Sequence, residues 1–209
     1  MHFSIPSTSS IHHLASDRLI SGSELENEIA KRTFILSSLG IGPRSYVVIA
    51  HGGTPEFFAD LFAVWRMGAC AACVNPGVTG GELYNLVSFT DSSLVLMGDK
   101  AADASKLNVK TIDLSIEKKS KILTPLVGSL DDPALILFTS GTTGQPKGVV
   151  HNFRSLFARI SLNRLYIGDD VLNKTLCVLP THFGHGLIGN CLTTLFAGGK
   201  LILRWRYWP

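Results

Sequence analysis

A glycine-rich segment with one lysine, residues 135–150, has the residue types of a phosphate-binding loop. It reads LILFTSGTTGQPKGVV, so a run of apolar, strand-forming residues leads directly into the loop. Glycines let backbone N–H groups approach an anion closely, and hydroxyl groups donate further hydrogen bonds. The lysine, Lys147, would supply positive charge for a polyphosphate. The glycines are Gly141, Gly144 and Gly148, and the hydroxyls belong to Thr139, Ser140, Thr142 and Thr143.

The order of residues in this segment excludes two familiar catalytic loops. The phosphate loop of nucleoside triphosphatases requires glycine before the lysine and Ser or Thr after it, whereas here Pro146 precedes Lys147 and Gly148 follows it. The nucleophile loop of serine hydrolases requires glycine two positions before the serine, where this chain has Phe138. A flexible, solvated turn remains the alternative interpretation of so many glycines.

Two capping-box patterns and a proline indicate where helices begin. Ser23 with Glu26 predicts a helix over 24–39, and Thr79 with Glu82 predicts another. Helical spacing of apolar residues supports the later helices, for which Asn152 is one predicted N-cap. The predicted helices cover 24–39, the segment that Thr54 and Pro55 begin and Gly68 ends, 83–89, 152–166 and 186–197.

Short apolar runs between these helices predict strands. They cover 46–50, 69–75, 94–97, 109–114, 134–138, 148–150, 175–180 and 200–203. Helices that alternate with strands are typical of an α/β fold, so we expect layered sheets flanked by helices. In such sheets ligands gather beyond the carboxyl ends of strands, and the glycine-rich loop leaves one of these ends.

Composition excludes several classes of partner. The chain has 209 residues, a formal net charge of +3 and no run of more than two basic residues, so a nucleic-acid partner is not expected. The N-terminus lacks the pattern of a secretory signal, and no window reaches the roughly 18 apolar residues of a membrane span. We therefore expect a cytoplasmic protein without an integral membrane segment. Nothing in the pattern indicates an oligomeric state.

Two of the four cysteines form a C-x-x-C pattern, Cys70 and Cys73, which is found in redox and metal sites. On an extended strand, however, residues three apart point to opposite faces of the sheet. We therefore interpret both cysteines as small buried residues.

The segment FTSGTTGQPKGV resembles the signature loop of the adenylate-forming superfamily, over a dozen contiguous positions. That superfamily includes acyl-CoA and aryl-CoA synthetases, luciferases and the adenylation domains of nonribosomal peptide synthetases. Residues 23–76 are similar to the first subdomain of those enzymes, and residues 179–203 resemble a later segment of the same large domain. The resemblance implies the N-terminal part of the large domain of an adenylate-forming enzyme.

The resemblance also implies an activity, its ligands and its site residues. A carboxylic acid attacks the α-phosphate of ATP to give an acyl adenylate, and a thiol of coenzyme A or of a carrier protein then accepts the acyl group. Residues 139–144 (Thr139, Ser140, Gly141, Thr142, Thr143 and Gly144) and Lys147 would surround the β- and γ-phosphates. Thr142 or Thr143 would lie close to magnesium. The loop would act by binding charge, without a covalent step of its own.

The segment THFGHG carries two histidines, His182 and His185, three positions apart. The family places a histidine or aromatic residue here beside the acid, which makes His182 and Phe183 candidates for the substrate side. The family's usual histidine position is occupied by Phe183, and His182 stands one place earlier. A packing role for both residues and a metal site made by the two histidines are the alternatives.

The resemblance divides the chain into three parts. Residues 1–20 are expected to be an N-terminal tail, 21–203 a partial AMP-binding domain with a linker-like segment at 115–133, and 204–209 an end outside the family pattern. Because the family's enzymes are much longer, we expect an incomplete acid–thiol ligase. The alternative is a non-catalytic remnant that binds nucleotide weakly or binds a protein partner.

Overall fold

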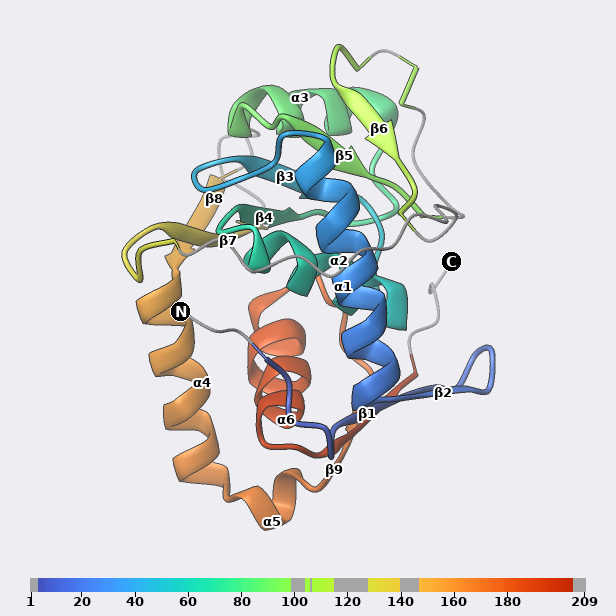
Figure 1. Ribbon diagram of the computed structural model, residues 1–209, viewed down its shortest axis with the longest axis vertical. Helices are drawn as coiled ribbons and strands as arrows, with labels where there is room; N and C mark the ends of the chain where they lie inside the picture. The colour runs from blue at the N-terminus through green and yellow to red at the C-terminus, as the bar shows by residue number, and fades with distance from the viewer. Residues whose placement is uncertain (1–3, 99–103, 106, 115–127, 140–146, 205–209) are drawn as a thin grey trace.

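The computed structural model describes residues 4–98, 104–105, 107–114, 128–139 and 147–204. In this part of the chain the strands form two sheets, with helices packed against them (Figure 1). This arrangement confirms the predicted α/β fold of layered sheets flanked by helices.

The larger sheet is parallel except at one edge. Its strands lie in the order β6-β5-β3-β4-β7-β8, and only β8 pairs in the antiparallel sense. Central strands such as β4 are buried along their whole length, which explains their continuous apolar sequences. The strands are β3 (Tyr46–Ile49), β4 (Cys70–Cys73), β5 (Leu94–Leu96), β6 (Lys110–Ile112), β7 (Pro133–Thr139) and β8 (Lys147–Asn152).

Helices cover both faces of this sheet. Helices α1 (Gly22–Ser38) and α2 (Pro55–Arg66) share one core with Cys73, whereas α3 (Gly80–Thr90) packs in a second core with Cys70. Alternate residues of each strand therefore enter different cores. The predicted separation of the two cysteines onto opposite faces is confirmed.

Three of the predicted helix starts are confirmed and one is wrong. Thr54, Thr79 and Asn152 cap their helices as expected. The first helix, however, begins two residues before the predicted start: the Ser21 side chain accepts a hydrogen bond from the Glu24 backbone N–H, and the Glu24 carboxylate accepts one from the Ser21 N–H. Both Ser21-x-x-Glu24 and Ser23-x-x-Glu26 satisfy the sequence pattern. The structure uses the first because Ser21 ends a strand and has extended backbone geometry.

The smaller sheet joins the two ends of the described chain. Its order is β2-β1-β10-β9, with β1 (Ser10–His13) parallel to β10 (Lys200–Leu203), β10 parallel to β9 (Lys174–Cys177), and β2 (Arg18–Ser21) antiparallel to β1. Residues 10–13 and 18–20, which were predicted to belong to an N-terminal tail, therefore lie in the strands of a sheet. Alternation over only four residues is too short a pattern to predict β1 and β2, whereas the apolar runs at 175–180 and 200–203 predicted β9 and β10.

Of the remaining helices, the first two connect the larger sheet to the smaller one, and the last two connect β9 to β10 within the smaller sheet. They are α4 (Phe153–Ile167), α5 (Asp169–Leu172), the π-helical segment η1 (His185–Leu192) and α6 (Thr193–Phe196). The predicted helix at 186–197 corresponds to η1 and α6 together. Most of the predicted linker, residues 115–127, lies outside the described residues.

One core lies between the two sheets and holds them together. It contains Phe57 and Phe58 of α2, Leu187 of η1, and Leu201 of β10, all of which are almost completely buried. An ion pair between Arg18 of β2 and the first turn of α2 adds a polar contact between the layers. The carboxyl edge of the larger sheet is thereby held against residues 181–184, which follow strand β9 of the smaller sheet.

Candidate functional site

The carboxyl ends of β3, β4, β5 and β7 share one edge of the larger sheet, because these strands are parallel. This is the edge at which open α/β sheets bind ligands. The glycine-rich loop follows β7 at this edge, and the segment 50–54 follows β3. The predicted location of the loop at the carboxyl end of a strand is confirmed.

The structure describes the two ends of the glycine-rich loop. Thr139 ends β7 and pairs in register with Lys147, the first residue of β8. The Thr139 hydroxyl lies 3.5 Å from the Lys147 carbonyl oxygen, to which it donates, and both residues are exposed. The hairpin therefore brings the lysine back to the strand end that the loop leaves.

The middle of the loop, residues 140–146, lies outside the described residues. The roles of Ser140, Gly141, Thr142, Thr143 and Gly144 toward phosphate, and of the two threonines toward magnesium, therefore stay predictions.

Gly148 has a structural reason for its missing side chain. It pairs with Phe138 in the hairpin, and an added Cβ would lie 3.1 Å from Ile136 Cγ2 and 3.2 Å from a ring carbon of Phe89. The absence of a side chain at Gly148 thus allows the Phe89 ring of α3 to pack against the sheet. Gly148 was predicted to be one of the glycines that let backbone N–H groups approach a phosphate. Its described contacts, however, are packing contacts.

The segment 181–184 lies against the same edge, although it follows a strand of the other sheet. The Gly53 backbone N–H donates to Thr181 Oγ1 at 3.1 Å, and an added Cβ on Gly52 would lie only 2.4 Å from the same oxygen. On the other side, a Cβ on Gly184 would lie 3.4 Å from Leu137 of β7. His182 and Phe183 are therefore held between the ends of β3 and β7, next to the strand that leads into the glycine-rich loop.

His182 has the properties of a neutral imidazole with an unused polar atom. Its exposed fraction is 9%, and its Nδ1 has no hydrogen-bond partner within the described ranges. Burial lowers the pKa of His182 below its ordinary value, because the charged form loses hydration. The adjacent Phe183 ring lies 4.4 Å away between centroids and is half exposed. A polar group of a ligand would satisfy the histidine while the ligand's apolar part contacts the phenylalanine.

The residues that hold this segment in place were not predicted from the sequence. Thr181, Gly52 and Gly53 were not singled out, although two consecutive glycines after a buried strand are a recognisable sign of close backbone approach. Their partnership spans more than a hundred residues of chain, so no local pattern could reveal it.

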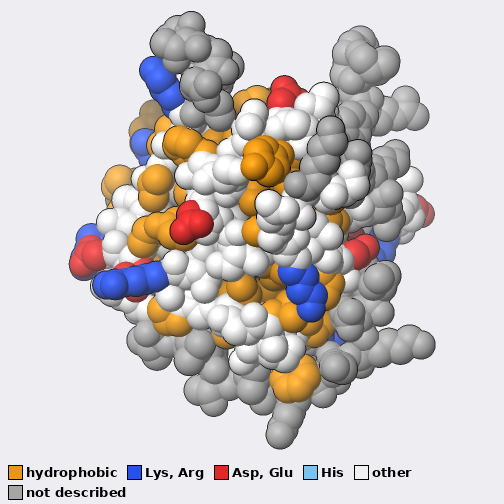
Figure 2. Space-filling model, turned by 90° about the horizontal axis from the view of Figure 1, so that it is seen from above, with side chains coloured by type: hydrophobic (Ala, Val, Ile, Leu, Met, Phe, Trp, Pro, Cys, Tyr) orange, Lys and Arg blue, Asp and Glu red, His pale blue; other side chains and the backbone are white. Residues whose placement is uncertain are grey.

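Neither a cluster of metal-ligating side chains nor a membrane-spanning helix occurs among the described residues. No group of three His, Cys, Asp or Glu side chains there could hold a metal ion, so the alternative metal site at His182 and His185 gains no third ligand from these residues. Figure 2 shows positive and negative side chains scattered over one face of the molecule. None of the described helices has the length and apolar character needed to cross a bilayer.

Comparisons with known proteins agree with this arrangement. A family model described as "AMP-binding enzyme" matches residues 7–207. The chain is 32% identical to oxalate–CoA ligase of Arabidopsis thaliana over 188 residues, which cover 81% of this chain and 37% of that protein. It therefore spans little more than a third of the length of this curated relative. The family match also includes part of the segments 1–20 and 204–209, which the sequence analysis placed outside the domain.

Solved structures show the same fold. o-Succinylbenzoate coenzyme A synthetase from Bacillus subtilis, in complex with AMP, matches with a TM-score of 0.82 and 20% identity, over 92% of this chain and 51% of that chain. ATP-bound MatB from Rhodopseudomonas palustris matches with a TM-score of 0.80 and 23% identity, over 96% of this chain and 42% of that chain. At these identities the likeness is one of fold.

Proposed function

The chain belongs to the AMP-binding enzyme family, and on that basis we propose that it serves the ATP-dependent activation of a carboxylic acid to an acyl adenylate. Transfer of the acyl group to a thiol, of coenzyme A or of a carrier protein, is the second proposed step. The relatives that carry CoA-ligase activity support this class of reaction. Because the chain spans 37% of oxalate–CoA ligase, the complete reaction is proposed for the chain as part of such a ligase.

The observation that carries the proposal is the meeting of two distant segments at one sheet edge. Acyl-adenylate formation joins a carboxylate to a nucleotide phosphate, so the two binding regions must be adjacent. Thr139 and Lys147 flank the glycine-rich loop at the end of β7. His182 and Phe183 lie beside the same strand, with Gly184 packed against Leu137.

Each side of the proposed site has a separate task. On the nucleotide side, Lys147 supplies charge and the hydroxyl and amide groups of residues 139–144 supply hydrogen bonds to the β- and γ-phosphates of ATP. Thr142 or Thr143 would hold the accompanying magnesium. On the acid side, the neutral His182 offers a nitrogen to the polar end of the acid, and Phe183 offers an apolar surface. The bound ATP supplies the leaving pyrophosphate.

Replacing Lys147 tests the nucleotide side. A hydrogen bond to a charged group contributes about 1.5–3 kcal/mol, so Lys147→Ala should weaken ATP use by roughly tenfold to a hundredfold. Calorimetric titration with ATP and magnesium measures binding, and pyrophosphate release with a panel of carboxylic acids measures turnover. The matched control is Lys174→Ala, which removes an exposed lysine at the start of β9 in the other sheet.

Equal ATP affinity in the wild-type chain and Lys147→Ala would contradict the role of the loop. ATP binding that depends on Lys147, without pyrophosphate release for any acid, would favour a nucleotide-binding role over catalysis by this chain alone. Replacing His182 or Phe183 and comparing selectivity among acids tests the other side. Unchanged selectivity in both variants would favour packing roles for these residues.

A further inference from the structure

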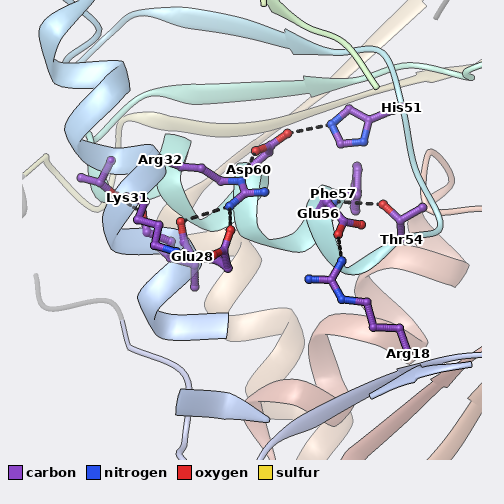
Figure 3. A network of polar contacts seen from close by, with 11 residues as sticks. Arg18, Glu28, Lys31, Arg32, His51, Thr54, Glu56, Phe57 and Asp60 are labelled. Atoms are coloured by element: carbon purple, nitrogen blue, oxygen red, sulfur yellow. Dashed lines mark hydrogen bonds and ion pairs between the residues drawn. The ribbon is translucent and has the colours of Figure 1, made fainter. Parts of the chain in front are cut away.

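A polar network lies behind the carboxyl edge of the larger sheet, which forms the candidate site, at the end of the central strand β3 (Figure 3). It consists of Arg32 of α1, Asp60 of α2 and His51, two residues after β3. The His51 Nε2–H donates to Asp60 Oδ2 at 2.7 Å, and the Arg32 Nε–H donates to Asp60 Oδ1 at 2.7 Å. We call these three residues the buried polar network. Each oxygen of the Asp60 carboxylate therefore accepts one hydrogen bond, one from His51 and the other from Arg32.

The burial of the network calls for a reason other than stability. Arg32 and Asp60 are each only 2% exposed, and Arg32 makes a further ion pair with Glu28 at its outer end. Removing charged groups from water is costly, and well-packed apolar residues are often as stabilising as a buried ion pair. What a charged network provides is direction, because its hydrogen bonds are satisfied in one arrangement only.

The network holds the His51 ring in one orientation. Asp60 accepts from one ring nitrogen, and the Phe57 ring meets the imidazole edge-on with centroids 6.1 Å apart. The third side is closed by Gly98, where an added Cβ would lie 2.9 Å from His51 Cβ and 3.1 Å from Cγ. A side chain fixed on three sides also fixes the backbone that carries it.

That backbone continues into the contact that holds the acid side of the site. The residue after next, Gly53, has φ of +69° and donates its N–H to Thr181 Oγ1 at 3.1 Å. Thr181 is 3% exposed and immediately precedes His182. An unbroken line of hydrogen bonds and covalent bonds therefore runs from α1 and α2 through residues 51–53 to the segment of the proposed acid pocket.

We propose that the buried polar network consists of positioning residues that act through Gly53 and Thr181 to orient His182 and Phe183. The network does not itself contact the acid. The identity of the ligand rests on the proposed function, whereas the orientation of His182 by the network can be measured without turnover. Loss of the buried polar network should therefore weaken binding of the acid and leave binding of ATP at the glycine-rich loop largely unchanged.

Two substitutions of His51 separate positioning from packing. His51→Leu removes the donor to Asp60 and keeps an apolar side chain of moderate size. His51→Gln keeps a side-chain N–H that can donate to Asp60, and it is the matched rescue variant. In a pyrophosphate-release assay, His51→Leu should raise KM for the acid by about tenfold, the equivalent of one hydrogen bond to a charged group, with KM for ATP changed less than twofold. His51→Gln should recover most of the loss.

A second measurement needs no activity. NMR spectra of the histidine rings report the environment of His182, whose signal is assigned by its absence in His182→Gln, and amide exchange reports the Gly53 N–H. His51→Leu should shift the His182 ring signal and speed exchange at Gly53 by about tenfold, because the contact with Thr181 opens more often. His51→Gln should resemble the wild-type chain.

A folded His51→Leu protein with an unchanged His182 signal and unchanged Gly53 exchange would overturn the proposal. If His51→Leu does not fold, His51→Phe provides the same test, because it keeps an aromatic ring and removes the donor to Asp60. Absence of ATP binding and of pyrophosphate release in the wild-type chain would count against the proposed function alone. The NMR comparison would still decide whether the network orients His182.

Discussion

The close approach of Gly52 to Thr181 leads to a sharp prediction about the substitution Gly52→Ala. Gly52 does not have a positive φ, so its backbone conformation accepts an alanine and any penalty is steric. The new Cβ would lie 2.4 Å from Thr181 Oγ1, well inside van der Waals contact. The next nearest atoms are Thr181 Cβ at 3.8 Å and Pro76 Cγ at 3.9 Å, which are ordinary contacts. The steric clash can therefore be relieved only if the Thr181 hydroxyl group moves.

Movement of that hydroxyl breaks its hydrogen bond with Gly53. A buried N–H left without a partner costs about 1–3 kcal/mol, and an off-rotamer side chain adds about 0.5–1.5 kcal/mol. Gly52→Ala should thus lower the free energy of unfolding by about 1.5–4.5 kcal/mol. For a chain of this size each kcal/mol corresponds to a fall in Tm of about 2–4 °C.

A double-mutant cycle measured by urea denaturation checks the reasoning. Thr181→Ala removes the hydroxyl, so Gly52→Ala in that background should cost less than about 0.5 kcal/mol more. Thr181→Ser keeps a hydroxyl and is the control, in which Gly52→Ala should remain costly. Additive effects of Gly52→Ala and Thr181→Ala would refute the steric argument, since the penalty would then arise elsewhere.

Three further predictions concern stability. Ser21→Ala should lower the free energy of unfolding by about 1 kcal/mol and Ser23→Ala by less than half of that, because only Ser21 caps α1 through the backbone; urea denaturation of the two variants decides. Arg32→Met should destabilise by about 3–5 kcal/mol, because it leaves the buried Asp60 without its cation; a loss below 1 kcal/mol would contradict this pairing. Burial lowers the pKa of His182 in the folded state, so the unfolded chain binds more protons near its ordinary value of 6.5. Stability should therefore fall as the pH drops below 6.5, and His182→Gln should show a shallower fall between pH 7 and 5 in unfolding measurements.

Local patterns predicted most elements of the larger sheet. Buried strands such as β3 and β4 have continuous apolar sequences, and helices such as α2 and α3 begin at a Thr that caps them. These signals depend on neighbouring residues only. The misplaced start of α1 shows the limit, because two serines offered the same pattern and the preceding strand β2 decided between them.

Two strands of the smaller sheet, β9 and β10, were predicted as well, whereas its N-terminal strands β1 and β2 were not. Its strand β1 pairs with β10 across almost the whole chain, and Ile11 is buried only because Leu201 and its neighbours lie opposite. A four-residue strand has too few alternations to stand out from a polar N-terminus. For this reason residues 1–20 were predicted to be an N-terminal tail.

By itself the sequence determined the family, and it predicted the chemistry of the glycine-rich loop. The dozen contiguous residues around Lys147 predicted the adenylate-forming superfamily, and the family match over residues 7–207 confirms it. Glycine, hydroxyl and lysine residues are adjacent in the chain, so phosphate binding by this loop can be predicted without a fold, and it stays a prediction.

Only the tertiary structure decided what lies beside the end of β7, the strand that leads into that loop. Parallel strand order brings the ends of β3 and β7 to one edge, and the hydrogen bond from Gly53 to Thr181 joins residues 128 positions apart. It also placed His51 against Asp60 behind this edge and left His182 Nδ1 without a partner among the described residues. Such contacts depend on how the two sheets pack, and packing brings together residues that share no local pattern.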